Sequence, residues 1–316
     1  MTAPAPAPAT APAAATPSGR EAYRDALVRL MLEDERVVCL DSDTGLFSGV
    51  DFGLASARYT NLGIAEQNMM GVAAGLARSG LIPFVNTMAA FASTRAVEAV
   101  KIDIAYAGLP VRVVATHAGL SAGHLGPTHH CLEDLAVMRL FPGMTVAVPA
   151  DAGAVESVLH QGMELPGPLY VRLGRAATPA LPAAAETPRL GRAQLLRTGE
   201  DVTLVACGPY PVRYALAAAD ILAAEGVDAS VLNMHTVKPL DTAALAAARA
   251  VVTVEEHWRS GGLGGAVAET LAPRGVRVAR VGVDDTFVAE SGPHEYLLGR
   301  AGLTPGAVAE AAHSVL

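Results

Sequence analysis

The sequence predicts an α/β fold built from two doubly wound domains with mainly parallel sheets. Short β-branched runs alternate with helical segments, and an aperiodic stretch rich in Ala and Pro at 176–188 interrupts this alternation once. Such alternation is typical of parallel sheets covered by helices. With 316 residues, of which 51% are hydrophobic, the chain is long enough for about two domains. We divide it into an Ala/Pro tail (1–18), a first domain (19–178), a linker (179–195) and a second domain (196–316).

The first domain starts with an amphipathic helix at 20–34, in which Leu27, Leu30 and Met31 share one face. The other elements alternate after it. We predict strands at 36–43, 81–87, 110–119, 144–151 and 168–175, and helices within 61–80, 90–108 and 152–164. The run at 110–119 has the nearly continuous apolar character of a strand buried on both faces.

The second domain repeats the alternation without repeating any motif. We predict strands at 201–208, 228–241 (with a turn), 250–257 and 276–285, and helices at 211–226 and 260–272 (after a turn). The turn "SGGLGG" is rich in glycine but lacks the GxGxxG pattern, so we interpret it as a packed turn. His257 precedes it and is compatible with either a functional or a surface role.

Composition excludes several classes of function. The net charge is −8 and no basic stripe with interleaved aromatics occurs, which argues against nucleic acid and fits a small-molecule substrate. No apolar run has the length of a membrane span. The three cysteines are widely spaced, which favours a reducing cytoplasm. The N-terminal tail alternates Ala and Pro without a positive region, so we predict an extended or disordered tail, not a secretory signal.

A carboxylate stands at the front of an apolar helix, in "NLGIAEQNMMGVAAGLA". Burial there would disfavour the charged form of Glu66 and raise its pKa, as in active-site acids that donate a hydrogen bond. The alternative is ordinary compensation of the helix dipole in the first turn.

Four histidines fall in one Gly-rich loop, "THAGLSAGHLGPTHH", directly after the most apolar strand. Loops at the carboxyl ends of parallel strands bind ligands in α/β folds. The histidines His117, His124, His129 and His130 therefore indicate proton transfer or recognition of substrate oxygens. Zinc ligation is the competing interpretation, but the loop has no zinc-binding spacing. Packing is the structural alternative and suits His130 best.

Two arginines end the strand "LYVRLGR". Arg172 and Arg175 would clamp a phosphate or carboxylate, or would form surface ion pairs.

These segments together resemble the C-terminal half of transketolase, over about residues 20–312. The segments "NLGIAEQNMMGVAAGLA", "THAGLSAGHLGPTHHCLEDLAVMR", "LYVRLGR", "VKPLD" and "VEEHWRSGGLGGAVAE" carry the resemblance in order and spacing. It implies a thiamine diphosphate pyrimidine-binding domain followed by a transketolase C-terminal domain. The implied reaction is transfer of a two-carbon ketol or acyl unit between a ketose-type or 2-oxo donor and an aldehyde-type acceptor.

The resemblance also implies roles for single residues. Glu66 would hydrogen-bond N1′ of the aminopyrimidine and so activate the cofactor. His117 and His129 would contact the donor or its intermediates, with His124 as a further candidate. The C-terminal domain would supply dimer contacts and no direct catalytic role.

The remaining implied contacts surround these residues. Arg175 and, nearby, Arg20 would bind substrate phosphate. Phe91 would line the aminopyrimidine pocket, Met88 stands where the family often has a second aromatic residue, and Asp43 matches an acidic residue near the cofactor.

Two departures from the family pattern are informative. Leu125 replaces an aspartate that recognises a donor hydroxyl in the family, which favours a donor without that hydroxyl or a specialised substrate. The Gly-Asp-Gly motif that holds Mg²⁺ and the diphosphate is absent. We therefore expect no metal ligands in this chain and a separate N-terminal transketolase subunit carrying that motif, most simply in a heterotetramer. The rival hypotheses are the beta subunit of a 2-oxoacid dehydrogenase and a non-catalytic partner subunit.

Overall fold

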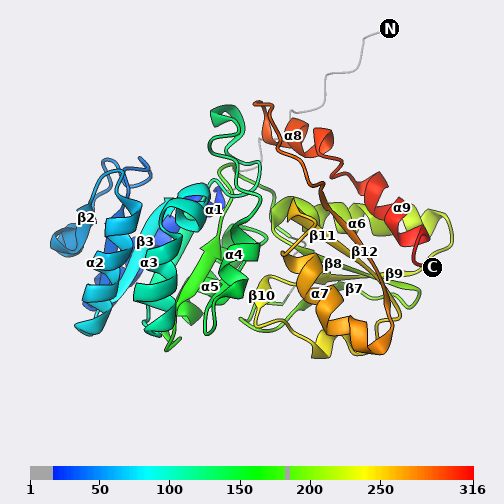
Figure 1. Cartoon of the computed structure of the whole chain (residues 1–316), viewed down its shortest axis with the longest axis horizontal. Coiled ribbons are helices and arrows are strands. Elements are labelled where there is room, and N and C mark those ends of the chain that lie inside the picture. The colour runs from blue at the N-terminus through cyan, green and yellow to red at the C-terminus, as the bar shows by residue number, and fades with distance from the viewer. Residues whose placement is uncertain (1–16, 182–185) are drawn as a thin grey trace, which may run out of the picture.

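The computed structural model describes residues 17–181 and 186–316, and it contains two sheets side by side (Figure 1). The predicted tail falls outside the described residues except for Pro17 and Ser18. Ser18 caps helix α1 (Gly19–Glu33), with its hydroxyl accepting from the Glu21 backbone N–H and the Glu21 carboxylate accepting from the Ser18 backbone N–H. This reciprocal cap explains why the helix starts where the Ala/Pro sequence ends.

The first sheet has seven strands in the order β10-β5-β6-β4-β3-β1-β2. All neighbours are parallel except the β10–β5 pair. The strands are β1 (Val37–Asp41), β2 (Tyr59–Asn61), β3 (Ile82–Met88), β4 (Arg112–Thr116), β5 (Thr145–Ala147), β6 (Leu169–Arg172) and β10 (Thr236–Lys238).

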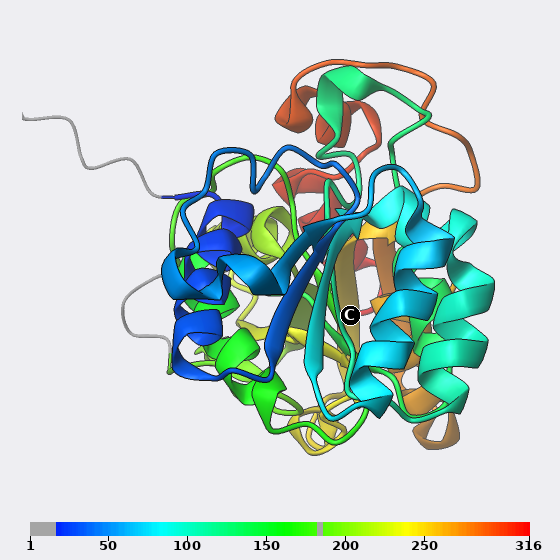
Figure 2. The same ribbon diagram turned by 90° about the vertical axis from the view of Figure 1, so that its left-hand side faces the viewer.

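Helices cover both faces of this sheet (Figure 2). On one face lie α2 (Glu66–Arg78), α3 (Val97–Ala99) and α4 (Asp134–Leu140), and on the other lie α1 and α5 (Ala152–Met163). Neighbouring residues along β4 illustrate the division, because Val113 packs with the first group and Val114 with the second. This alternation produces the continuous apolar pattern of the strand.

The second sheet has five strands in the order β12-β11-β8-β9-β7, and only the β7–β9 pair is antiparallel. Its strands are β7 (Gln194–Arg197), β8 (Val202–Cys207), β9 (Ala229–Asn233), β11 (Ala250–Trp258) and β12 (Arg277–Val283). Helices α6 (Pro209–Ala224) and α9 (Pro305–His313) pack on one face and α7 (Leu263–Leu271) on the other, while α8 (His294–Arg300) follows a long segment after β12. The predicted α/β class with mainly parallel sheets is confirmed.

One predicted strand is divided between the two sheets. β9 lies in the second sheet, but β10, only a few residues later, pairs with β5 of the first. Lys238 fixes this crossing by donating from Nζ to the carbonyl oxygens of Arg139 and Phe141. One apolar core also runs from α2 through α4 to α7. The two sheets are therefore packed together as one body.

The predicted helix at 90–108 is present but irregular. Phe91–Arg95 and Val100–Tyr106 are π-helical and flank the short α3. Wider helical turns of this kind redirect side chains and occur frequently at functional sites.

Candidate functional site

The predicted site residues line one edge of the first sheet. Asp43 follows β1, Glu66 follows β2, His117 follows β4 and Arg175 follows β6. Met88 is the last residue of β3, and Phe91 comes shortly after it. These five strands are consecutive neighbours in the sheet. At a strand spacing of about 4.8 Å the edge spans roughly 19 Å. The carboxyl ends of parallel strands thus bring together residues that are far apart in the sequence.

Glu66 is a deeply buried carboxylate of this edge, with 1% exposure at the first residue of α2. Its Oε2 accepts from Nη1 of Arg95 at 2.8 Å, and the Arg95 guanidinium also lies 4.4 Å from the centroid of the Phe91 ring. The π-helical turn carries both Phe91 and Arg95 toward Glu66. Sequence analysis missed Arg95, because nothing in the local pattern distinguishes it from an exposed helix residue.

Asp43 and Met88 lie at the adjoining strand ends. Asp43 is exposed, has a positive φ of 61° and accepts from Nδ2 of Asn61 at 3.2 Å. The turn is held beneath it by buried Asp41, which accepts from Asn86 Nδ2 at 2.6 Å and from Thr44 Oγ1 at 2.9 Å. Met88 is half-buried. Both residues therefore lie at the same sheet edge as Glu66, with surface open to solvent.

His117 occupies the middle of the edge. It is 4% exposed, and its φ of 58° is a strained conformation for a residue with a side chain. Its Nδ1 lies 3.0 Å from Thr116 Oγ1. Burial, followed by the charges of Arg20 and Arg175 and by His129, lowers the pKa of His117 to about 4. The ring is therefore neutral near pH 7 and can accept or donate a hydrogen bond as either tautomer allows.

The other loop histidines differ in their surroundings. His129 packs edge-on against Phe91, with ring centroids 5.3 Å apart, so the loop and the Glu66 end of the site are connected. His124 and Leu125 are exposed near the loop tip, in a short 3₁₀ turn. His130 turns away, and its Nδ1 lies 3.2 Å from the Val288 carbonyl oxygen, which agrees with the packing alternative.

Arg20 and Arg175 form the far end of the site. Both line a groove of about 370 Å³ that also contains His124 and His294. Burial and then the charge of Arg175 lower the pKa of Arg20, and its buried Nε lacks a hydrogen-bond partner within 17–181 and 186–316. Two neighbouring cations with an unused donor fit an anionic group of a substrate. Leu125 does not line this groove.

Arg172, in contrast, is held in a buried ion pair away from this groove. Its Nε donates to both carboxylate oxygens of Asp134, at 2.8 and 3.1 Å, and the two side chains are 6% and 0% exposed. Of the two alternatives for these arginines, the clamp is excluded because only Arg175 lines the groove, and the ion pair of Arg172 is buried and not at the surface.

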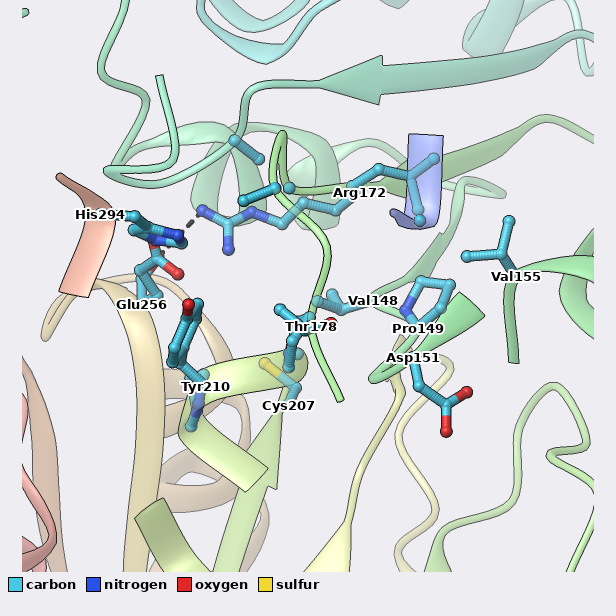
Figure 3. Close-up of a pocket in the computed structure, with 18 residues that line it drawn as sticks. Val148, Pro149, Asp151, Val155, Arg172, Thr178, Cys207, Tyr210, Glu256 and His294 are labelled. Carbon is cyan, nitrogen blue, oxygen red and sulfur yellow. Dashed lines mark hydrogen bonds and ion pairs between the residues drawn. The ribbon is translucent and has the colours of Figure 1, made fainter. Parts of the chain in front are cut away.

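A narrow cavity lies between the two sheets, beneath the histidine loop (Figure 3). Glu256, His294 and Tyr210 lie on one side of it and Arg172 crosses above them, with Glu256 and His294 in contact. Sequence analysis missed Glu256 and His294, which come from the second domain. The neighbouring Glu255 accepts from the Leu263 and Gly264 N–H groups at 2.6 and 2.8 Å, so the packed-turn interpretation of "SGGLGG" is confirmed.

His257 is also structural. Its Nε2 accepts from the Ala136 N–H at 3.2 Å, which leaves Nδ1 to donate to the Trp258 carbonyl oxygen at 2.7 Å. In the described ranges, no three His, Cys, Asp or Glu side chains are grouped as metal ligands would be. No helix there is both long and apolar enough to cross a bilayer.

Comparison with known proteins agrees with this architecture. The family model for the transketolase pyrimidine-binding domain matches residues 15–180, and that for the transketolase C-terminal domain matches 191–308. The chain therefore belongs to the transketolase family, and it carries these two domains of it. The resemblance inferred from the motifs is confirmed.

Individual relatives extend over most of the chain. The 6-deoxy-6-sulfo-D-fructose transketolase subunit SqwH of Clostridium sp. (strain MSTE9) is 42% identical, covering 94% of this chain and 94% of that subunit. An apulose-4-phosphate transketolase subunit of Phocaeicola vulgatus is 38% identical, covering 87% of this chain and 90% of that relative. A solved structure described as a split-gene transketolase in an inactive beta4 tetramer is 42% identical, with a TM-score of 0.85 and coverage of 95% and 98%. The similarity is thus to enzymes that are transferases made of separate subunits.

Proposed function

We propose that this chain is the C-terminal half of a split, thiamine diphosphate-dependent transketolase that moves a two-carbon unit from a ketose-type donor to an aldehyde-type acceptor. The observation that carries the proposal is the buried Glu66 carboxylate, joined through Arg95 to the Phe91 ring, on the same sheet edge as His117 and Arg175. Arg95, which pairs with Glu66, is itself 46% exposed at this edge, so its contact with the carboxylate is open to exchange with a ligand.

The donor set fits the aminopyrimidine of the cofactor. Glu66 would hydrogen-bond a ring nitrogen, Phe91 and Met88 would contact the ring faces, and Asp43 would lie nearby. When bound, thiamine diphosphate supplies the nucleophilic carbon that takes up the two-carbon unit. In the assembled site, Glu66 would exchange its Arg95 contact for the ring nitrogen and hold a proton there.

The middle of the edge would act on the substrate. Neutral His117 and the half-buried His129 would hydrogen-bond substrate oxygens and move protons between them, with His124 assisting from the loop tip. Leu125, exposed on the same turn, would leave one donor hydroxyl unrecognised.

The substrate class follows from the arginine groove. Arg20 and Arg175 would bind an anionic group at the end of the sugar chain. Two relatives are named for sugars that carry such a group, a sulfosugar and a sugar phosphate. We propose that the ketose donor or the aldehyde acceptor carries a terminal phosphate or sulfonate.

The partner would be an N-terminal transketolase subunit with the Gly-Asp-Gly motif. This subunit would hold Mg²⁺ and the diphosphate of the cofactor. The face beside the start of α2 suits such a partner, because Ile64, just before α2, and Ile102, in the helical segment after α3, are exposed, and Ile102 shares a hollow with Gln67 and Asn68 next to Glu66. Relatives named as subunits support a split enzyme, most simply a heterotetramer. Three buried, free thiols suit a cytoplasmic location.

The test is Glu66→Gln in the complex assembled with such a partner. We expect the complex to form, as judged by size-exclusion chromatography, and kcat to fall by roughly 100-fold or more, because the amide cannot hold the proton. Glu33→Gln, at the exposed end of α1 away from this edge, is the control and should keep full activity. Unchanged activity in Glu66→Gln would favour a non-catalytic partner subunit instead.

A further inference from the structure

The histidine loop (residues 117–130) is attached to the second domain where it begins and ends. Gly119 and Cys131 close the loop with two backbone hydrogen bonds of 2.8 and 2.9 Å. Beyond this closure, the Trp258 N–H of β11 donates to the Leu132 carbonyl oxygen at 3.1 Å. Figures 1 and 2 also show the loop beside the segment that precedes α8, where the Gly292 N–H faces the Gly123 carbonyl oxygen at 3.4 Å.

The central contact of this attachment is Glu256, at the end of β11. Its Oε1 accepts from the Leu120 N–H at 2.6 Å and lies 2.8 Å from Nε2 of His294. The Glu256 residue is 6% exposed, so both contacts are shielded from water. The Leu120–Glu256 contact joins two residues that are 136 positions apart in the sequence, and Leu120 lies three residues after His117.

The loop backbone is shaped to admit this carboxylate. Gly119 has a φ of +64°, and a Cβ there would lie 2.2 Å from Oε1 of Glu256. Only glycine avoids both the strained backbone and this collision. Glu256 therefore occupies space that any other residue at position 119 would fill.

The charge on Glu256 is stabilised where it lies. Burial alone would raise the pKa of Glu256, but His294, Arg172 and the Leu120 N–H outweigh burial and keep the pKa below its ordinary value. His294 is oriented in turn by the Tyr210 ring, which meets it edge-on at 4.7 Å, and the Tyr210 hydroxyl donates to Glu295 at 3.0 Å (Figure 3). A charged acceptor makes a stronger hydrogen bond to the loop than a neutral one.

We propose that Glu256 and His294 are a positioning pair, through which the second domain holds the turn at Gly119–Leu120 and so fixes His117 for the reaction. This inference rests on the proposed transferase function. It assigns the second domain a part in the reaction beyond the dimer contacts expected from the sequence. His294 also lines the arginine groove, so the pair joins the two walls between which a substrate would lie.

The test compares Glu256→Ala with Glu255→Ala in the assembled complex. Both positions carry buried carboxylates of β11 that accept backbone N–H groups, but Glu255 serves α7 and Glu256 serves the loop. Hydrogen–deuterium exchange of peptides spanning 117–131 and 260–272 reports each contact separately. We expect Glu256→Ala to speed exchange of the loop amides roughly tenfold or more, and Glu255→Ala to do so only in the α7 peptide.

Kinetics supply a second readout. The donor is hydroxypyruvate, which gives up a two-carbon unit with loss of carbon dioxide, and the acceptor is glycolaldehyde. We expect kcat/KM for the donor to fall roughly tenfold in Glu256→Ala while the Kd of thiamine diphosphate stays within about twofold of the wild type. Glu256→Gln keeps an acceptor oxygen for the Leu120 N–H and should recover most of the loss. Gly119→Ala should loosen the loop from the opposite side and serves if Glu256→Ala does not fold.

The outcomes separate the two proposals. Loop exchange and kcat/KM unchanged in Glu256→Ala, or the same changes in both alanine variants, would overturn the positioning pair. A wild-type complex without turnover would instead count against the proposed function, whereas the exchange comparison would still test the contact itself.

Discussion

Replacing Asp134 by Asn tests whether the buried pair with Arg172 holds the site end of the first sheet in place. Asp134 accepts two contacts from Arg172 Nε and one from the Tyr170 hydroxyl at 2.8 Å, and it is 0% exposed. The variant keeps the shape of the side chain but removes the hydrogen-bonded counterion of the buried Arg172, which then has the weaker attraction of Glu256 in its place. Removing one partner from a buried ion pair costs roughly 3–5 kcal/mol of unfolding free energy.

A surface pair of the same kind provides the control. Arg139 and Glu269 lie 2.6 Å apart, but Glu269 is 67% exposed. Glu269→Gln should therefore cost less than about 1 kcal/mol. The difference between the two variants isolates the effect of burial from that of removing a negative charge.

Urea denaturation measures both values. Circular dichroism would follow the whole chain, and fluorescence of the single tryptophan, Trp258, would follow the contact between the domains. Coincident transitions justify comparing the extrapolated free energies. If Asp134→Asn costs no more than Glu269→Gln, the reasoning about a buried charge that loses its hydrogen-bonded counterion is refuted. A double variant with Arg172→Met should lose less than the sum of the single variants, because it removes that charge.

Two further predictions concern the substrate residues. The pKa of His117 is about 4 in the folded protein, against 6.5 for an unperturbed histidine. Between these two pH values the unfolded chain therefore binds more protons than the folded protein. The free energy of unfolding is expected to fall as the pH drops from about 6.5 to 4. At about 1.4 kcal/mol per pH unit this contribution reaches about 3 kcal/mol, and urea denaturation of His117→Asn should show a pH dependence shallower by that amount, whereas an equal slope would contradict it. Arg175→Met should raise KM for a sugar substrate with a terminal phosphate by roughly 10- to 100-fold, with kcat nearly unchanged. The KM for an uncharged analogue should stay the same. Equal effects on both substrates in steady-state assays would exclude a contact between Arg175 and the anionic group.

The elements of the fold are largely predictable because their apolar periodicity is local. Strands such as β4 and β8 and helices such as α1 and α6 carry their patterns within a few residues. The position of β10 is not predictable in this way, because the sequence does not encode locally which of two sheets a three-residue strand joins. Its place depends on contacts such as Lys238 with Arg139, about a hundred positions away.

The candidate site shows the same division. Glu66 and the histidine loop stand out through short motifs, and the order of parallel strands brings them to one edge. Three other residues could not be found from the sequence, because each acts through a partner that is distant along the chain. Arg95 pairs with Glu66, Glu256 with Leu120, and His294 with Glu256. Arg172 was ambiguous because its strand-end position suits a ligand and a buried ion pair equally, and only the position of Asp134 decides between them.

Isothermal titration calorimetry of thiamine diphosphate with Mg²⁺ tests the central claim most directly. It would be performed on this chain alone and again after mixing with an N-terminal transketolase subunit that carries the Gly-Asp-Gly motif. The account predicts no measurable binding to the chain alone and stoichiometric binding to the assembled complex. Tight binding to the chain alone would contradict the account, because it would require a complete diphosphate site within this sequence.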